Sequence, residues 1–457
     1  MKKQVLQTTF VACMAAFAMA DAAVAAPGSA LTAIGGNPAA SADGKVPAWV
    51  GANGIEQGWS YGKSRLAAWK YADDKPLFTI TEANAAQYAK NLTAGELAAL
   101  KTLPGYSMVV YPTRRDCGVP GFEAANSQKN VGYAQLDSDG WGLKQAYVPG
   151  IPFPKPTNGA EVMWNSKMRY RGLAVDYPHI NTMVSPAPGS KDWITAFSTQ
   201  TLFYPWGVAG THKLSDYPPL EYETYFAYTA PPSLEGQALV VKYYLNQPGS
   251  ETYYYFPGQR RVRRMPAYAY DAPQIGFEGQ YLMDEPMVFN GTIDRYNWKI
   301  LGKREIYVPY NSFGAYAFDK PLKTVVGPHY LNPAYRRYEL HKVWVVQATL
   351  KKGFRDIAPK RTFFIDTDSW IILAREDYDA KGKLFKYAES YPIPVYETGS
   401  CDATAFSQYN LSEGRYVFDM NPVGGGKDVH WLTKPDSSPR TVDSFYTANN
   451  LATMSAQ

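Results

Sequence analysis

The sequence predicts a mainly β protein of the α+β class, built around a large antiparallel sheet. Strand-like runs rich in Val, Tyr, Thr and Phe follow one another between residues 106 and 391. Short turn sequences such as Gln247-Pro248-Gly249-Ser250 separate these runs, so consecutive strands can pair as antiparallel meanders. Few segments are long enough to be crossover helices, and no repeat recurs at a fixed period. A parallel sheet, a propeller and a solenoid are therefore disfavoured.

Residues 1–25 have the pattern of a secretory signal peptide. Lys2 and Lys3 precede an apolar stretch at residues 11–20, and Ala23-Val24-Ala25 is a small-x-small cleavage site. The apolar stretch is short for a membrane span. We expect an exported chain that starts near Ala26, with an uncleaved anchor as the alternative.

Residues 26–105 are predicted to form an extended arm followed by short helices. Residues 27–60 are rich in Gly, Ala, Asn and Pro and carry little periodicity. Residues 81–103 fit two short helices, and Thr93 with Glu96 forms a capping box at the start of the second. Pro104-Gly105 ends that helix.

Residues 106–420 are predicted to form the antiparallel β domain, and residues 421–457 a tail that is mostly loop. The tail contains Gly424-Gly425-Gly426 and two prolines between residues 435 and 439. The predicted strands cover residues 106–111, 161–175, 193–204, 221–230, 238–246, 252–256, 260–265, 296–307, 338–350, 362–366, 370–377 and 384–391.

A predicted hairpin at residues 252–265 is the strongest chemical feature. Four aromatic residues run into Pro257-Gly258, and four arginines follow within five residues. With a strand period of two, Arg260 and Arg264 share one face, while Arg261 and Arg263 share the other. A strand on an ordinary core has one apolar face, so this hairpin is predicted either to edge a wet cavity or to bind an anionic, apolar molecule.

The candidate ligand-binding residues combine arginine with aromatic side chains. A guanidinium can stack on a tyrosine ring and still present its donors to a carboxylate or phosphate. The alternative is that these arginines pair with nearby acids such as Asp271 or Glu251. The candidates are Arg260, Arg261, Arg263, Arg264, Tyr253, Tyr255, Arg295 and Trp298.

Cys117 and Cys401 are predicted to form a disulfide. An exported chain meets an oxidising compartment, where two cysteines usually pair. The bond closes a loop of 284 residues and thus predicts one compact body, and two free thiols are the alternative.

Composition and motifs exclude several classes of function. The formal net charge of +5 is too small and too dispersed for a dedicated nucleic-acid binder. The five histidines lack metal-ligand spacings, and no nucleophile elbow, P-loop or dinucleotide motif is present. We therefore expect no enzyme, no catalytic residues, no metal and no cofactor. Tyr outnumbers Phe, 36 to 20, which suits half-wet binding surfaces.

The chain resembles a bacterial exported family known as domain of unknown function 1329, over roughly residues 30–420. The hairpin carries part of this resemblance. The matching stretches include Asp43-Gly44-Lys45-Val46-Pro47-Ala48-Trp49, Pro112-Thr113-Arg114-Arg115, Pro257-Gly258-Gln259-Arg260-Arg261-Val262-Arg263-Arg264, Asp294-Arg295-Tyr296-Asn297-Trp298-Lys299 and Ile365-Asp366-Thr367-Asp368-Ser369-Trp370.

The family looks like an elaborated relative of the periplasmic lipoprotein carriers LolA and LolB. The resemblance implies a curved sheet, or incomplete β-barrel, plugged or flanked by a few short helices. It also implies a cavity for an acyl chain or another apolar molecule, and no established catalytic residues. Periplasmic location in a Gram-negative bacterium follows, with an outer-membrane protein or an efflux-type transporter as the expected partner.

The function that these observations predict is non-catalytic carriage of a lipid or other hydrophobic molecule in the periplasm. A carbohydrate-binding or outer-membrane assembly protein is the alternative, because tyrosine and tryptophan also stack on sugars. A hydrolase with dispersed carboxylates is the third hypothesis, because glycosidase acids can come from anywhere in a chain.

Overall fold

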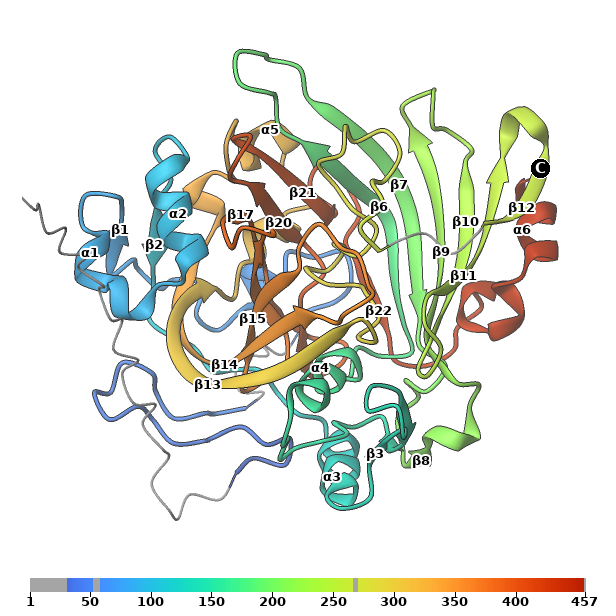
Figure 1. Ribbon diagram of the computed structural model, residues 1–457, viewed down its shortest axis with the longest axis horizontal. Helices are drawn as coiled ribbons and strands as arrows, with labels where there is room; N and C mark the ends of the chain where they lie inside the picture. The colour runs from blue at the N-terminus through green and yellow to red at the C-terminus, as the bar shows by residue number, and fades with distance from the viewer. Residues whose placement is uncertain (1–30, 52–57, 266–269, 456–457) are drawn as a thin grey trace, which may run out of the picture.

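The computed structural model describes residues 31–51, 58–265 and 270–455. The predicted signal peptide lies outside these residues and stays a prediction. A sixteen-stranded sheet dominates the fold and does not close into a barrel (Figure 1). Along its main path the strands are β1 (Phe78–Ile80), β2 (Met108–Val110), β14 (Tyr338–Leu350), β15 (Lys360–Asp366), β16 (Ile372–Tyr378), β17 (Leu384–Ser390), β20 (Phe406–Asn410), β21 (Arg415–Asn421), β6 (Ala174–Val184), β7 (Ile194–Phe203), β9 (Leu220–Ala230), β10 (Ala238–Tyr244), β11 (Ser250–Phe256) and β12 (Arg261–Met265).

Two more strands pair beside this path, β13 (Tyr296–Pro309) with β14 and β22 (His430–Leu432) with β6. Among the described residues, the sheet's pairings are antiparallel except the short parallel contact of β2 with β14. The mainly β, largely antiparallel class is thus confirmed. Small two-stranded sheets join β3 (Gln135–Leu136) to β4 (Leu143–Gln145), β5 (Tyr147–Val148) to β8 (His212–Lys213) and β18 (Ile393–Val395) to β19 (Ser400–Asp402).

Short helices flank the sheet rather than cross it. Thr93 and Glu96 form the predicted capping box at the start of α2. None of the described helices is long and apolar enough to cross a membrane. The α-helices are α1 (Ala85–Tyr88), α2 (Ala94–Thr102), α3 (Gly121–Asn130), α4 (Gly159–Lys167), α5 (Leu322–Val325) and α6 (Ala448–Ser455).

The predicted strand at residues 161–175 is wrong over most of its length, because residues 159–167 form α4. The Asn158 side chain accepts a hydrogen bond from the Glu161 amide and starts this helix. Strand β6 begins only at Ala174 and continues past Pro178, where its pairing with β7 shifts register. Pro178 cannot donate a backbone hydrogen bond to the neighbouring strand, and the irregular register accommodates it.

The C-terminal tail is more structured than predicted. It contributes strand β22 and helix α6, which short apolar runs among Gly and Pro did not reveal. Phe445, Tyr446 and Leu451 of this region form a second apolar cluster against one face of β10 and β11.

The sheet has two halves that meet where β21 pairs with β6. Val417 lies opposite Val184, and Phe418 lies opposite Met183. We call the half formed by β6, β7, β9, β10, β11 and β12 the outer wing, which stands at the right of Figure 1 with α6 beside it. The predicted Cys117–Cys401 disulfide is present and links the segment after β2 to β19.

Candidate functional site

Strands β11 and β12 form the predicted hairpin, with its turn at Pro257–Gln259. Tyr254 lies opposite Arg263, and Phe256 lies opposite Arg261. Because directly opposed residues of an antiparallel pair share a face, these four side chains point to the same side of the sheet. We call this side the inner face.

The other face of the hairpin is covered. Tyr253 and Tyr255 pack in the apolar cluster with Phe445, Tyr446 and Leu451, at the C-terminal helix. Tyr253 and Tyr255, predicted as ligand-binding residues, therefore cannot line the same surface as the arginine pair of the inner face. Their burial instead attaches the C-terminal tail to the outer wing.

An aromatic patch continues from the hairpin across the inner face. Tyr254 lies beside Leu239 of β10, and Leu239 lies beside Phe226 of β9. Tyr254 stacks on Phe256 with ring centroids 4.5 Å apart, and Phe226 meets Tyr228 edge to face at 4.7 Å. All five side chains are only partly buried. We call Phe226, Tyr228, Leu239, Tyr254 and Phe256 the aromatic patch.

The opposite end of the inner face is covered by the segment between β12 and β13. Tyr222 donates a hydrogen bond to Asn290 Oδ1 at 2.6 Å, and Asn290 donates to the Tyr243 hydroxyl at 3.1 Å. Tyr222 and Tyr243 share the face of the aromatic patch, because they stand an even number of residues from Phe226 and Leu239. The inner face is therefore closed at one end and half-exposed at the hairpin end.

The arginines of the hairpin differ in whether they have an acidic partner. Arg264 pairs with Glu251 at 3.3 Å, as the acid-pairing alternative expected. Arg261 and Arg263 are exposed, and neither has an acidic partner within 4 Å among the described residues. Arg260 is exposed in the turn, with a left-handed φ of 50°. Two unpaired cations thus border the aromatic patch.

Arg295 lies in the core, and Trp298 is partly buried against the core. Arg295 is 1% exposed and pairs with Asp284 at 2.5 Å and with Asp356 at 2.9 Å. Trp298 donates its indole N–H to the Ile293 carbonyl at 2.7 Å. The structure gives both residues internal partners, so we do not assign them to the half-exposed surface.

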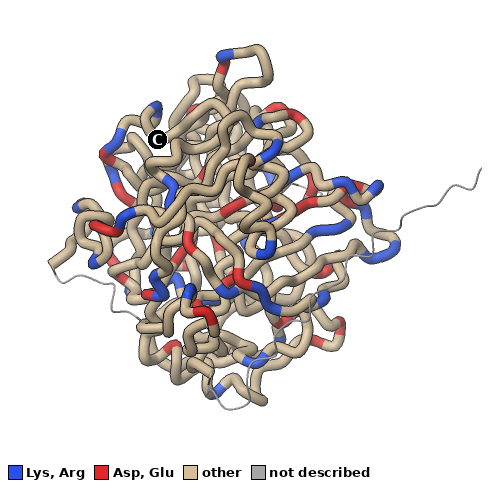
Figure 2. Tube along the Cα trace, turned by 90° about the vertical axis from the view of Figure 1, so that its left-hand side faces the viewer, with Lys and Arg blue, Asp and Glu red and all other residues tan. Residues whose placement is uncertain are grey.

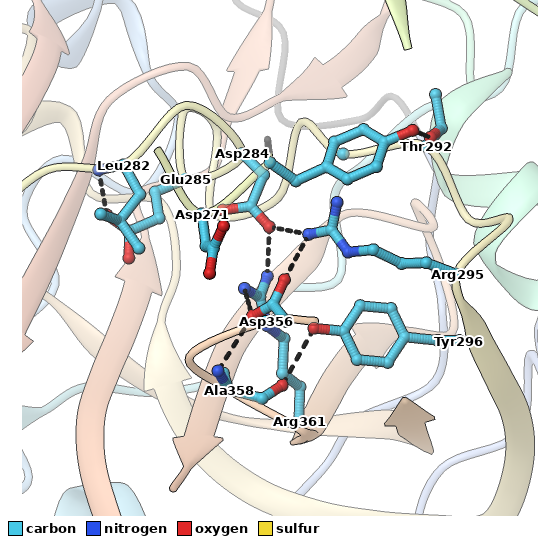
Figure 3. A network of polar contacts seen from close by, with 12 residues as sticks. Asp271, Leu282, Asp284, Glu285, Thr292, Arg295, Tyr296, Asp356, Ala358 and Arg361 are labelled. Atoms are coloured by element: carbon cyan, nitrogen blue, oxygen red, sulfur yellow. Dashed lines mark hydrogen bonds and ion pairs between the residues drawn. The ribbon is translucent and has the colours of Figure 1, made fainter. Parts of the chain in front are cut away.

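A buried ion network surrounds Arg295, as Figure 3 shows. Arg361 donates to Asp284 at 2.7 Å and to Asp356 at 3.2 Å. Burial by itself would raise the pKa of Asp284, but Arg361, Arg295 and Arg375 hold that pKa below its ordinary value. The network continues through the Arg375–Asp377 and Lys386–Glu285 pairs. Paired charges therefore occupy this part of the core. Figure 2 shows that basic and acidic residues are distributed over the whole trace.

One cavity near this network is small. A cavity of about 30 Å³ lies beside this network, and its walls include Arg171, Tyr204, Tyr222 and Phe289. Such a volume holds about one or two water molecules. The acyl-chain cavity that the family resemblance implies is not found at this position.

The same cavity offers no pair of catalytic acids. Glu221 is the one acid among its lining residues, and it pairs with Lys167 at 2.9 Å. Burial raises the pKa of Glu123 to about 7, but this acid lies on helix α3 and not in the cavity. This cavity therefore adds no support for the hydrolase hypothesis.

The sequence offered both arginine pairs of the hairpin and named Tyr253 and Tyr255 as aromatic walls, which lie on the other face from Arg261 and Arg263. It did not single out Tyr254 and Phe256, which stand opposite Arg263 and Arg261. Phe226, Tyr228 and Leu239 come from strands whose neighbours could not be deduced from local pattern. The ion network was equally hidden, because its members lie on strands far apart in the sequence.

Fold and geometry define a mainly β protein with an open sixteen-stranded sheet. The chain belongs to the family described as protein of unknown function (DUF1329), whose model matches residues 79–452. It is 37% identical over 401 residues to an uncharacterized protein of Pseudomonas aeruginosa, and the match covers 85% of each chain. The family predicted from the sequence is thus confirmed.

Solved structures with some likeness include a putative outer membrane lipoprotein-sorting protein domain from Vibrio parahaemolyticus, at 13% identity and a TM-score of 0.42, covering 64% of this chain and 98% of that one. A DUF1329 family protein from Desulfovibrio piger has the same identity and TM-score and covers 64% and 97%. A LolA superfamily protein from Nitrosomonas europaea has 11% identity and a TM-score of 0.38 and covers 64% and 98%. Strand order and register, not these likenesses, define the fold of this chain.

Proposed function

We propose that this protein is a non-catalytic periplasmic carrier for an anionic amphiphile, such as a lipid with an acidic head group. One observation carries the proposal: the half-exposed aromatic patch lies beside two arginines, Arg261 and Arg263, that have no acidic partner among the described residues. Apolar and cationic groups adjoin on one face, which matches the two ends of such a molecule.

The aromatic patch supplies the apolar part of the binding energy. Covering exposed apolar area stabilises a complex by about 25 cal/mol per Å². Phe226, Leu239 and Phe256 offer no side-chain hydrogen-bonding group, so hydrocarbon suits this surface better than a sugar ring. Because the cavity beside the ion network is too small for an acyl chain, the chain lies along the inner face in this proposal.

Arg261 and Arg263 supply the polar part. Both stand on an edge strand, where their guanidinium groups can reach a carboxylate or phosphate with two parallel hydrogen bonds. Exposed ion pairs contribute about 0.2–1 kcal/mol each, so two of them set orientation and selectivity more than total affinity.

The compartment in this proposal is the periplasm. The signal-like N-terminus and the Cys117–Cys401 bond support it, because disulfides persist in exported proteins. The proposed partner that gives or receives the ligand is an outer-membrane protein or an efflux-type transporter.

The test compares two double variants of the hairpin. A fluorescent long-chain fatty acid and its neutral methyl ester are titrated into the mature protein and into Arg261→Gln/Arg263→Gln. We expect the double variant to bind the acid about tenfold more weakly, as two exposed charge contacts predict, and the ester unchanged.

Arg260→Gln/Arg264→Gln is the matched control, because it removes two charges from the same hairpin without touching the inner pair. This control should bind the acid like the parent protein. If both double variants bound the acid equally weakly, the effect would come from net charge alone. That result would overturn the assignment of Arg261 and Arg263 to the head group. Glycan binding without any fatty-acid binding would instead favour the carbohydrate alternative.

A further inference from the structure

Three ligating side chains from separate strands and turns meet in the core. His341 lies in β14, Asp366 ends β15 and Asp368 follows in the next turn. One ligand atom from each residue lies within 4.8 Å of the other two. Their exposed fractions are 0%, 0% and 4%. The sequence predicted no metal ligands because no histidine had a suitable neighbour, and strand pairing supplies those neighbours.

Two atoms of this cluster are left without partners. Asp366 Oδ2 accepts hydrogen bonds from Tyr310 at 2.8 Å and from Ser369 at 2.5 Å. Its other oxygen, Oδ1, has no hydrogen-bond partner within the described part of the chain, and neither has His341 Nδ1. Leaving a buried polar atom unsatisfied is costly, so a ligand that satisfies both atoms is favoured.

The orientation of the imidazole is fixed by a carboxylate. His341 Nε2 lies 3.1 Å from Glu339 Oε2. Because an ionised carboxylate only accepts hydrogen bonds, Nε2 carries the hydrogen, and Nδ1 of the neutral ring presents a lone pair. A carboxylate that holds one ring nitrogen while the other is free is the usual support for a metal-bound histidine.

The charge balance of the cluster also favours a cation. Arg115 pairs with Asp368 at 2.7 Å, and Arg337 pairs with Glu339 at 2.5 Å. Asp366 has no ion pair within 4 Å among the described residues. A buried carboxylate without a counter-charge is costly.

We propose that His341, Asp366 and Asp368 bind one divalent transition-metal ion. An imidazole nitrogen with carboxylate oxygens is a donor set that such ions accept, at bond lengths of roughly 2.0–2.2 Å for Zn²⁺. A bridging water has only two hydrogens to donate and leaves the negative charge uncompensated.

In this proposal the ion has a structural role, because its ligands connect separate parts of the chain. Arg115, which holds Asp368, also donates to the carbonyls of Asn37, Ala39 and Pro47 in the N-terminal arm. The site thus connects β14, β15 and the arm at one point in the core. It lies away from the aromatic patch, so the carrier proposal and the metal proposal stand or fall separately.

The test measures metal content in untagged mature protein purified from the periplasm without chelators. Inductively coupled plasma mass spectrometry should find about one divalent ion per chain. Asp366→Asn keeps the shape of the side chain and the acceptor for Tyr310 and Ser369 but removes the charge. We expect metal content in this variant to fall at least tenfold.

His329→Ala is the matched control, because it removes an imidazole outside the cluster and should retain the ion. Circular dichroism confirms that each variant is folded before metal is measured. If Asp366→Asn unfolds, the parent protein stripped with chelator and titrated with Zn²⁺ by calorimetry replaces it, and one site is expected. A metal-free parent that takes up no Zn²⁺ or Mn²⁺, or full metal retention in folded Asp366→Asn, overturns the proposal.

Discussion

At the scale of single residues, one glycine sets how closely helix α2 approaches the sheet. Gly95 donates its backbone N–H to Glu376 Oε1 at 2.7 Å. A Cβ atom added at Gly95 would lie 2.1 Å from Cδ2 of Tyr387, which is buried in β17. Helix and strand therefore meet with no room for a methyl group.

Gly95→Ala is expected to destabilise the protein by about 2–3 kcal/mol, because overpacking outweighs the gain of up to ~1 kcal/mol in helix propensity. Urea unfolding followed by circular dichroism measures the loss. Gly121→Ala, at the first position of α3 with no atom within 4 Å of its added Cβ, is the control and should not destabilise the protein, with a gain of at most about 1 kcal/mol. An unchanged midpoint for Gly95→Ala would contradict this account.

The sequence predicted which side chains of one strand share a face, but not which of the two faces is covered. The period of two correctly separated Arg261 and Arg263 from Arg264, since it depends only on strand geometry. Which face is covered depends on helix α6, more than 180 residues further along the chain. Local pattern carries no information about such a contact.

At the scale of elements, the capping box of α2 is buried rather than solvated. Glu96 has an exposed fraction of 0%, and its carboxylate accepts from the Thr93 amide at 2.7 Å. Burial, which is the largest effect, raises the pKa of Glu96 to about 8. The acid therefore holds a proton in the folded protein at neutral pH.

This proton makes the stability of the protein depend on pH. Between the ordinary glutamate pKa and about 8, the unfolded chain has lost the proton while the folded chain retains it. The folded state then binds more protons, so stability falls as pH rises through this range. Glu96→Gln keeps the capping geometry without the charge and should flatten the fall.

Urea midpoints at pH 5, 6.5 and 8 measure this dependence. Glu161→Gln is the control, because Glu161 holds the corresponding third helical position in α4. The control should keep the parental slope. An identical slope in Glu96→Gln would show that another group is responsible.

Elements were predictable where periodicity and turn chemistry agreed. The capping box and the hairpin turn had both signals and were right. Helix α4 had a capping signal at Asn158, but the apolar run that follows suited a strand equally well. Strand β21 is buried along its whole length without alternation, so no period marked it.

At the scale of the whole molecule, the disulfide spans most of the described chain. It closes a loop of 284 residues, so its loss should increase the conformational entropy of the unfolded chain and lower stability. We expect Cys117→Ala/Cys401→Ala to lose about 3–5 kcal/mol of unfolding free energy. Unfolding in urea with and without a reducing agent measures this loss.

Reduced parent protein should unfold like the double variant, and the double variant should not respond to the reducing agent. A loss below about 1 kcal/mol would mean that the unfolded chain is already constrained in another way. The pairing was predictable because only two cysteines follow the signal-like segment. The open sheet that the disulfide ties together, with its buried network of paired side-chain charges, was not predictable.

The junction of the two sheet halves has a consequence for the order in which the molecule is assembled. Strand β6 is translated before β21, and the partners Val184 and Val417 are separated by more than 200 residues. A chain emerging N-terminus first can complete the hairpin at β11 and β12 while one long edge of β6 still lacks its neighbour. Such an edge readily recruits strands from other chains. Residues 415–421 therefore complete the sheet late, by pairing with β6. A chain truncated before them keeps Arg261 and Arg263 but leaves an edge of β6 unpaired and prone to aggregation.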